Sequence, residues 1–512
     1  MQTDKSKLVF KDYNFNQNLL LPPSLEELIC PNHPVRVVNQ VVDNLNLDPV
    51  YEKYEGGGCP AYHPRLMLKI LVYGYLANLY TSRKIEQALH QNIHFMWLSG
   101  MSYPDHNTIN RFRSERLKHV LKEVFSQVVL LLVDLGHVTI KEAYLDGTKI
   151  EANANRYTFV WRKSSENQME KVKAQLKELW AYAESVAKQE MQENEPTDFE
   201  QIDPEKVERV IAQIDTALQG KKIEPKIKQK LSKAKKELPG RVKKYQDQQE
   251  KIGTRRSSMS KTDPDATFMR LKEEHLHNGQ LKPAYNVQLS TENQFILWYT
   301  LHQLAGDITS LPVHLQEFID KLGVHPEALI ADAGYGSEEN YQYLEDKGID
   351  AYIKYNTFEK EKTQKWQQDL SRIENLYYNP EQDSYYCPMG QKMDLVSEEV
   401  ISSDNGYKQF KKFYQAKNCS TCPMSGTCNK SPGNRRIGTS PVMQKHRAKA
   451  RELLNSEQGI KYRSKRSVDV EPVFGMIKYN RNYRRFLLRG LEKVEIETGL
   501  LAIAHNLKKM AS

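Results

Sequence analysis

The sequence predicts an α/β protein, in which helices flank a central mixed β-sheet and further segments are inserted into it. Between residues 142 and 355, apolar patterns follow the order strand, strand, strand, helix, strand, helix, strand. Over residues 1–135, apolar side chains recur at helical spacing instead. The chain has 512 residues, and a single core stops growing near roughly 250–300 residues. We therefore expect several packed units.

The N-terminal region, residues 1–135, is expected to be a helical DNA-binding domain. Apolar spacing indicates helices over residues 66–80 and 119–136. A short helix between them carries Arg111 and Arg113. Its pattern leaves two interpretations open, a helix-turn-helix reader or an ordinary basic surface helix.

The sheet is expected in two parts of one catalytic core, residues 136–160 and 262–356. In the first part, an apolar run ends in Asp146, and the following Gly147 indicates a strand that runs into a turn. In the second part, the run that ends in Asp332 has the same form. The carboxyl ends of strands are where sites form in open α/β sheets. The second part contains strand-like segments at 284–291, 295–303, 328–332 and 349–355, and a helix from about 310.

Residues 161–261 are expected to form a charged helical insertion. They are poor in Val and Ile and rich in Lys, Glu and Gln, which favours long surface helices over strands. Prolines at 196, 204 and 239 predict breaks between two or more such helices. The insertion is therefore interpreted as an arm.

Residues 357–454 carry a cysteine pattern typical of a zinc-ribbon-like insertion. Cys387 precedes Pro-Met-Gly, Cys419 and Cys422 are separated by two residues, and Cys428 follows. Four thiolates at such spacing predict a closed, structural Zn²⁺ site. The alternative is a set of reduced free thiols.

The last segment, residues 455–512, is expected to supply C-terminal helices to the core. Lys478 follows Glu471 by seven residues, two helical turns along the same face. Pro472 is tolerated if the helix begins near Asp469, because first-turn N–H groups have no partner within the helix. A structural Glu–Lys face is the alternative interpretation.

Two strand-end aspartates within one sheet point to a metal site. A lone aspartate at a strand end is usually a turn or cap residue. Two neighbouring carboxylates repel each other unless a cation lies between them, and Mg²⁺ and Mn²⁺ prefer such oxygens. Two metal ions roughly 3.5–4 Å apart stabilise attacking and leaving oxygens in phosphoryl transfer. Asp146, Asp332 and Glu471 are the candidate ligands.

The positive charge of the chain lies mainly in two segments. The formal net charge is +9. Residues 221–256 hold 14 basic and 4 acidic side chains, and residues 435–489 hold 15 and 4. Such concentration indicates a polyanionic partner, although solvated helix faces are the alternative.

Several classes of protein are disfavoured. The sequence contains no phosphate-binding loop or dinucleotide fingerprint, so we expect no nucleotide cofactor. No apolar run reaches the roughly 20 residues of a membrane span, and the N-terminus lacks the apolar region of a signal peptide. Six cysteines in a chain this long do not make a disulfide scaffold, which favours a cytoplasmic protein.

Three segments resemble the bacterial insertion-sequence DDE transposases, and the three candidate acids match that family's metal ligands. The resemblance implies a ribonuclease-H-like core with two Mg²⁺ or Mn²⁺ ions per active site. It also implies binding of double-stranded terminal repeats and target DNA, DNA cleavage and strand transfer. Further implications are a homodimer or higher oligomer on DNA, and a nucleoid-associated location. The matching segments are 144–156, 330–337 and 462–490.

The family's third motif places a tyrosine and an arginine seven and four residues before its glutamate. Here Tyr462 and Arg466 lie nine and five residues before Glu471, so Arg463 and Arg466 remain rival candidates for the motif arginine. Lys478 matches the motif lysine, with a catalytic role. The residues expected to contact DNA are Arg111, Arg113, Tyr462, Arg463, Arg466, Arg481, Arg484 and Arg485.

Two further functions remain open. A transposase relic would bind DNA as a repressor without cleaving it. A structure-specific nuclease on the same fold would cleave DNA without joining it.

Overall fold

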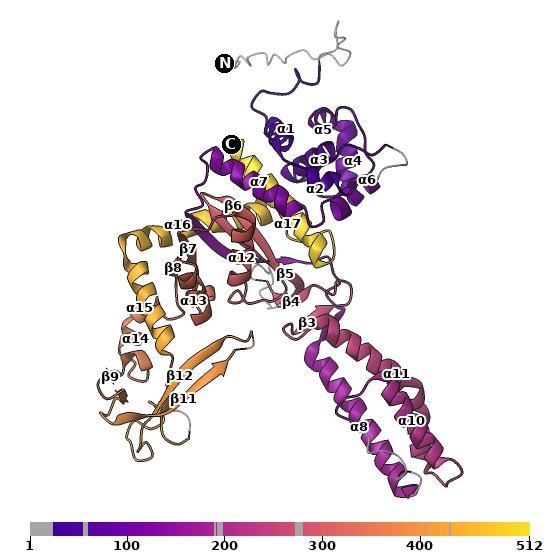
Figure 1. Cartoon of the computed structure of the whole chain (residues 1–512), viewed down its shortest axis with the longest axis vertical. Helices are drawn as coiled ribbons and strands as arrows, with labels where there is room; N and C mark the ends of the chain where they lie inside the picture. The colour runs from indigo at the N-terminus through magenta and orange to yellow at the C-terminus, as the bar shows by residue number, and fades with distance from the viewer. Residues whose placement is uncertain are drawn as a thin grey trace, which may run out of the picture.

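A mixed β-sheet lies at the centre of the molecule, with helices around it (Figure 1). This confirms the predicted α/β class with a mixed sheet. The protein is described by a computed structural model. The residues that it describes are 24–54, 60–188, 191, 198–271, 280–403, 405–429 and 432–512.

The central sheet has six strands, in the order β4-β5-β1-β7-β8, with β6 pairing along β5 as well. Strand β5 pairs antiparallel with β1, β4 and β6, whereas β1, β7 and β8 run parallel to one another. Strand β7 is buried throughout, whereas β1 and β8 are buried at only about half of their positions. The strands are β1 (Glu142–Glu151), β4 (Thr267–Arg270), β5 (Leu281–Glu292), β6 (Phe295–His302), β7 (Ala328–Ala331) and β8 (Asp350–Ile353).

Strand β1 corrects one prediction, because it does not end in a turn at Gly147. It continues to Glu151 and stays paired with β5 throughout. A side chain at position 147 would approach Gln288 Nε2 and Asp307 Oδ1, the latter to 2.8 Å. Glycine here therefore allows neighbouring side chains to pack against the strand, rather than forming a bend.

Helices cover the sheet and connect it to the N-terminal region. Helix α17 packs against β6, α7 and α3, and thereby joins the last segment of the chain to the first. Within the described residues, no helix is both long and apolar enough to cross a bilayer. These helices are α1 (Pro34–Asn44), α2 (Asp48–Tyr51), α3 (Pro64–Leu76), α4 (Ser82–Gln91), α5 (Ile93–Leu98), α6 (His106–Arg111), α7 (Leu121–Asp134), α12 (Leu311–Leu322), α13 (Glu338–Asp346), α15 (Pro441–Asn455), α16 (Glu457–Gly475) and α17 (Leu491–Met510).

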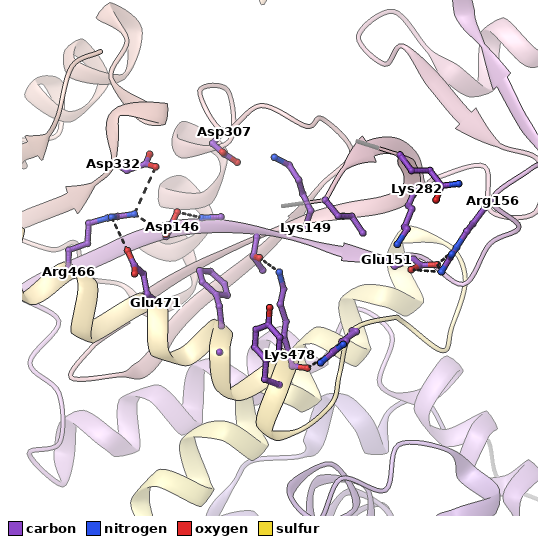
Figure 2. A pocket seen from close by; sticks show the side chains of 18 residues that line it. Asp146, Lys149, Glu151, Arg156, Lys282, Asp307, Asp332, Arg466, Glu471 and Lys478 are labelled. Atoms are coloured by element: carbon purple, nitrogen blue, oxygen red, sulfur yellow. Dashed lines mark hydrogen bonds and ion pairs between the residues drawn. The ribbon is translucent and has the colours of Figure 1, made fainter. Parts of the chain in front are cut away.

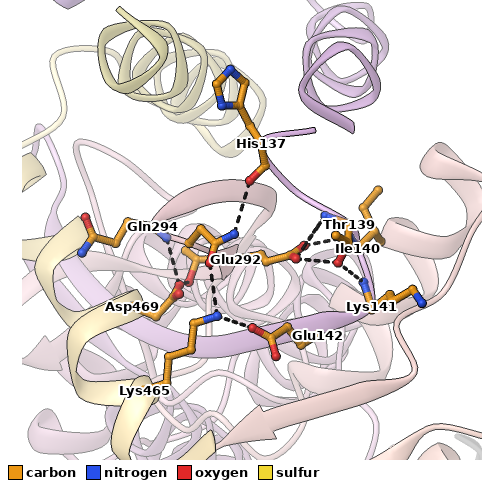
Figure 3. A network of polar contacts seen from close by, with 11 residues as sticks. His137, Thr139, Ile140, Lys141, Glu142, Glu292, Gln294, Lys465 and Asp469 are labelled. Carbon is orange, nitrogen blue, oxygen red and sulfur yellow. Dashed lines mark hydrogen bonds and ion pairs between the residues drawn. The ribbon is translucent and has the colours of Figure 1, made fainter. Parts of the chain in front are cut away.

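Helix α16 corrects a second prediction, because it begins at Glu457 and contains Pro472 in its interior. A proline there has no N–H to donate to the carbonyl four residues earlier, that of Val468. The side-chain amide of Gln294 donates to this carbonyl instead, over 2.8 Å. Asp469 accepts hydrogen bonds from Thr291 Oγ1 and from the backbone amide of Gln294. The β5–β6 turn therefore holds the middle of α16 (Figure 3).

The charged insertion forms an arm that projects away from the sheet (Figure 1). It consists of α8 (Arg162–Val186), α10 (Pro204–Leu218) and α11 (Pro225–Ile252), which share a core of their own. A helix begins at Pro204 as expected, but the predicted break at Pro239 is wrong, because α11 continues through it. Buried Leu238 and Val242 on either side pack into the same core and keep the helix continuous. Residue 196 lies outside the described residues.

The cysteine-bearing segment forms a second, antiparallel sheet in the order β13-β12-β11-β10-β9. Its small core contains Tyr385, Met393, Tyr414 and Ile437. The predicted range 357–454 also includes α15, which packs against β8 and α13 of the central layer. The strands are β9 (Tyr377–Asn379), β10 (Ser384–Tyr386), β11 (Lys392–Ser402), β12 (Lys408–Gln415) and β13 (Arg436–Thr439).

A buried polar network joins the N-terminal helices to α17. Arg113 donates to the hydroxyl of Tyr75, which donates in turn to Glu497. The other oxygen of Glu497 accepts from the amides of Leu487 and Leu488. Burial raises the pKa of Glu497. Since buried polar groups are costly to leave unpaired, this network fixes the relative position of the two regions.

We predict that Gly499→Ala in α17 destabilises the protein by about 1–3 kcal/mol, because an added methyl group overpacks a filled core. The new carbon would lie 2.7 Å from Leu121 Cδ2 and closer still to the Tyr299 hydroxyl. Urea denaturation measures the effect. The matched control is Gly240→Ala in α11, another glycine inside a helix, which has nothing within 4 Å. The control should stabilise its helix by about 0.5–1 kcal/mol, and equal losses in both variants would contradict the crowding argument.

Candidate active site

Two of the three candidate acids lie side by side because of strand pairing. Strands β1 and β7 are parallel, and their last paired residues are Leu145 and Ala331. One position further along, the two strands lead to Asp146 and Asp332. Asp332 Oδ1 accepts the amide of Gly334 over 2.8 Å, which fixes the side chain at the start of a short 3₁₀ turn.

Glu471 comes from α16, which crosses the sheet and contacts β1, β5 and β7. Its position depends on the anchoring of α16 at Asp469, two residues earlier. Lys465 reinforces that anchoring through Glu142 of β1 and through Asn293 Oδ1 (Figure 3). The helix therefore places an acid from the end of the chain above the two strand aspartates.

The guanidinium of Arg466 lies among all three carboxylates (Figure 2). Its Nη2 is 2.8 Å from Asp146 Oδ2 and 4.0 Å from Asp332 Oδ2. Its Nη1 is 3.5 Å from Glu471 Oε1. Three acids from distant parts of the chain thus converge on one cationic group.

This arrangement has a clear electrostatic reason. Carboxylates held this close together repel one another unless a positive charge lies between them. Arg466 supplies that charge and occupies the space between the acids. Within the described residues, no three histidine, cysteine or acidic side chains stand close enough together to share a metal ion. The donor set itself consists of hard oxygens, which suit Mg²⁺ or Mn²⁺.

The acids open into a cavity of about 710 Å³, whose lining carries six basic and five acidic side chains. Lys478 lies in the single π-helical turn that follows α16, and it donates to Thr148 Oγ1 on β1. Because Thr148 lies two residues after Asp146, both side chains face the same side of the strand. The other basic residues lining the cavity are Lys149, Arg156, Lys282 and Arg484.

Asp307 is a further acid of this cavity that the sequence reasoning missed. Its Oδ1 accepts from Asn286 Nδ2 over 2.7 Å and from Gln288 Nε2 over 2.9 Å, and both donors belong to fully buried residues. The side chain points toward the same space as Asp146 and Asp332 (Figure 2). Asp307 lies in the loop after β6 rather than at the end of an apolar strand. The sequence signal that could have pointed to Asp307 is a pair of polar residues inside an apolar strand, at positions 286 and 288.

Two family comparisons bear on this geometry. The family described as Transposase DDE domain matches residues 386–511, a range that includes Glu471 and Lys478. The family described as Transposase domain (DUF772) matches residues 23–115. Both matches are to transposase families, and they support an insertion-sequence DDE transposase. No curated protein and no solved structure matches it.

The fold places the residues expected to contact DNA in different surroundings. Arg111, Arg484 and Arg485 are exposed. Arg113 and Arg481 are instead buried, at 3% and 2% exposure. Arg113 donates to Tyr80 O and Arg481 to Ala504 O, and burial lowers the pKa of Arg481. These two guanidiniums therefore serve the interior of the protein, and we do not retain them as DNA contacts.

The two rival arginines of the third motif are also separated by the geometry. Arg466 reaches the acids, whereas the Arg463 guanidinium lies 5.4 Å from the centre of the Phe358 ring. Tyr462 is half-buried, and its ring packs edge-on against Tyr352 and Tyr144. Tyr462 and Arg463 thus stabilise the position of α16.

The four cysteines of the second sheet are half-buried free thiols. The amide of Gln391 donates to Cys387 Sγ and that of Arg435 to Cys419 Sγ, each over 3.3 Å. Arg435 Nη1 lies 2.7 Å from Cys428 Sγ.

We predict that Arg466→Ala lowers stability in EDTA by about 1–2 kcal/mol, because the three carboxylates then lack a counter-charge in a partly exposed site. Millimolar Mg²⁺ should raise the melting temperature of this variant more than that of the unaltered protein, since a bound cation replaces the guanidinium. Thermal unfolding with and without Mg²⁺ measures both effects. Arg463→Ala, one turn earlier on the same helix, is the matched control and should show no enhanced response to Mg²⁺. An equal response in both variants would rule out this role for Arg466.

Proposed function

We propose that the protein binds the terminal inverted repeats of its own element, cuts them, and joins the ends to target DNA. The observation that carries this proposal is the convergence of Asp146, Asp332 and Glu471 on a single cation, within 4.0 Å of each. The two matches to transposase families support DNA as the substrate, and the basic side chains of the cavity suit a phosphate backbone.

The catalytic core is proposed to be ribonuclease-H-like. Three antiparallel strands, β6, β5 and β1, are followed by two that run parallel to β1, and this order supports the proposal. Both aspartates belong to the two central parallel strands. The third acid comes from a helix that crosses the same layer, as the resemblance implies.

Asp146, Asp332 and Glu471 would hold two Mg²⁺ or Mn²⁺ ions. Such ions, when bound, activate the attacking oxygen and stabilise the leaving oxygen. The residues of the chain supply the remaining functions. Lys478 and Arg484 lie on the cavity wall, where positive charge neutralises and orients a phosphate. Arg466, which lies among the acids, would supply further positive charge beside that phosphate.

The remaining partners follow from the same proposal. Arg111 in the N-terminal domain and Arg485 near the cavity are exposed and would contact duplex DNA. A homodimer or higher oligomer would assemble on the two ends of the element. A cytoplasmic, nucleoid-associated location would follow from binding to DNA.

We predict that Asp332→Asn reduces Mg²⁺-dependent nicking of labelled terminal-repeat DNA by at least about 100-fold, because an amide is a poor metal ligand. DNA binding in EDTA should remain. Asp350→Asn, which changes an exposed aspartate at the start of β8 outside the cavity, is the control and should nick normally. Binding without nicking by the unaltered protein would indicate a repressor, and nicking without joining would indicate a nuclease. Either result would overturn the proposal.

We also propose that Cys387, Cys419, Cys422 and Cys428 hold a structural Zn²⁺ ion. Their spacing and the N–H donors to three of the sulfurs support thiolate ligands. The segment around them has only a small apolar core. A bound metal would therefore contribute much of its stability.

We predict about one zinc per chain in purified protein, and well below one in Cys422→Ser, because a structural site requires four ligands. Metal analysis of the purified proteins measures this. Cys30→Ser is the control, because Cys30 is exposed and far from this segment in the sequence. Zinc-free unaltered protein, or full occupancy in Cys422→Ser, would refute the site.

A further inference from the structure

The arm carries its positive charge on one of its three helices. Helix α11 contains ten basic and three acidic side chains. Helix α8 contains five and four, and α10 contains two and three. All three helices contribute to the same small core. A need for solubility alone would not concentrate the charge on a single helix.

Within α11, the charge lies on the side that faces away from the other helices. The residues of α11 that are buried in the arm core form one stripe, at Ile227, Leu231, Ala234, Leu238 and Val242. A second set of exposed residues lies on the opposite side of α11. It consists of three pairs, and the two members of each pair are seven positions, or two helical turns, apart. This set, the basic stripe, consists of Lys226, Lys233, Lys236, Lys243, Lys244 and Lys251.

The basic stripe also differs in its neighbours from two other lysines of α11, Lys230 and Lys235. Lys230 pairs with Glu178 of α8 over 2.6 Å, and Lys235 pairs with Asp215 of α10 over 3.0 Å. No lysine of the basic stripe has a carboxylate within ion-pair distance among the described residues of the chain. The ion pairs within the arm therefore do not include the basic stripe of α11.

An uncompensated stripe has an energetic cost. Like charges three or four residues apart destabilise a helix by about 0.2–0.5 kcal/mol per pair, and Lys233 and Lys236 are such a pair. The packing of the arm core offsets this cost in the free protein. A polyanion lying along the stripe would remove the repulsion and release counterions, which is the main source of affinity for DNA.

We propose that the basic stripe binds the phosphate backbone of duplex DNA outside the active-site cavity. This inference rests on the proposed function and assigns a second contact surface to the same substrate. Helix α11 has 28 residues, so it is about 42 Å long. That length exceeds one turn of duplex, which is about 34 Å. The stripe can therefore follow the backbone over a full helical turn.

The root of the arm links this stripe to the cavity, which favours DNA over an acidic protein as the partner. Arg156 lines the cavity three residues before β2 (Phe159–Trp161), the strand that leads into the arm. Arg485 donates to the carbonyls of Ala152 and Ala154 and so fixes this connecting segment. A duplex that leaves the cavity past Arg156 meets the root of the arm first.

The test measures duplex binding in EDTA over a salt series from 50 to 200 mM. The stripe variant combines Lys233→Gln, Lys236→Gln, Lys243→Gln and Lys244→Gln. Each phosphate contact contributes about 0.9 to the slope of log K against log salt. We therefore expect the stripe variant to bind more weakly and its slope to be smaller in magnitude by about 3–4, whatever the DNA sequence.

A matched control removes four positive charges from the other two helices of the arm, by Lys163→Gln, Lys171→Gln, Lys177→Gln and Arg209→Gln. Its slope should equal that of the unaltered protein. An unchanged slope in the stripe variant would overturn the inference, as would an equal loss in the control. An unchanged slope with loss of self-association would identify a protein partner and would also overturn it. If the unaltered protein fails to bind duplex at all, the proposed function itself fails.

Discussion

The repulsion between two neighbouring aspartates is the constraint on which the rest of the site depends. Parallel pairing of β1 and β7 brings Asp146 and Asp332 together, and no rearrangement of side chains alone can separate them widely. A cation must therefore lie between them. Helix α16 provides this cation, which is the guanidinium of Arg466, and the same helix carries Glu471. In the free protein the acids are thus held in place by a group that a metal ion can replace.

The placement of α16 is the second requirement, and it rests on the β5–β6 turn. Gln294 replaces the hydrogen bond that Pro472 cannot make, and Asp469 accepts from the same turn. Glu471 follows the two anchored residues, Val468 and Asp469, within one helical turn. The backbone of the helix is therefore fixed where the acid is needed, although the side chain itself is half-exposed, at 56%. The carboxylate of Glu471 therefore remains accessible while the backbone next to it is anchored.

Most of the acid site could be predicted from the sequence, because its signals are local. Asp146 and Asp332 follow apolar runs, and Glu471 with Lys478 has helical spacing. Asp307 was missed because its role depends on two buried amides from another strand. The roles of Arg113 and Arg481 were also not predictable. A buried arginine and an exposed one look alike in sequence, and only the tertiary packing distinguishes them. The uninterrupted α11 shows packing overriding a local helix-breaking signal.

The buried network of Arg113, Tyr75 and Glu497 has a mechanical consequence for the whole protein. It joins the N-terminal helices to α17, and α17 lies directly on the sheet that carries the acids. The N-terminal domain is thus packed against the rest of the protein rather than joined to it by a flexible linker alone. Any duplex held by that domain would meet the acids at a fixed angle and distance. The protein would therefore fix the spacing between the bound sequence and the acids. The position of a cut relative to a bound sequence would then be set by folding, before any DNA arrives.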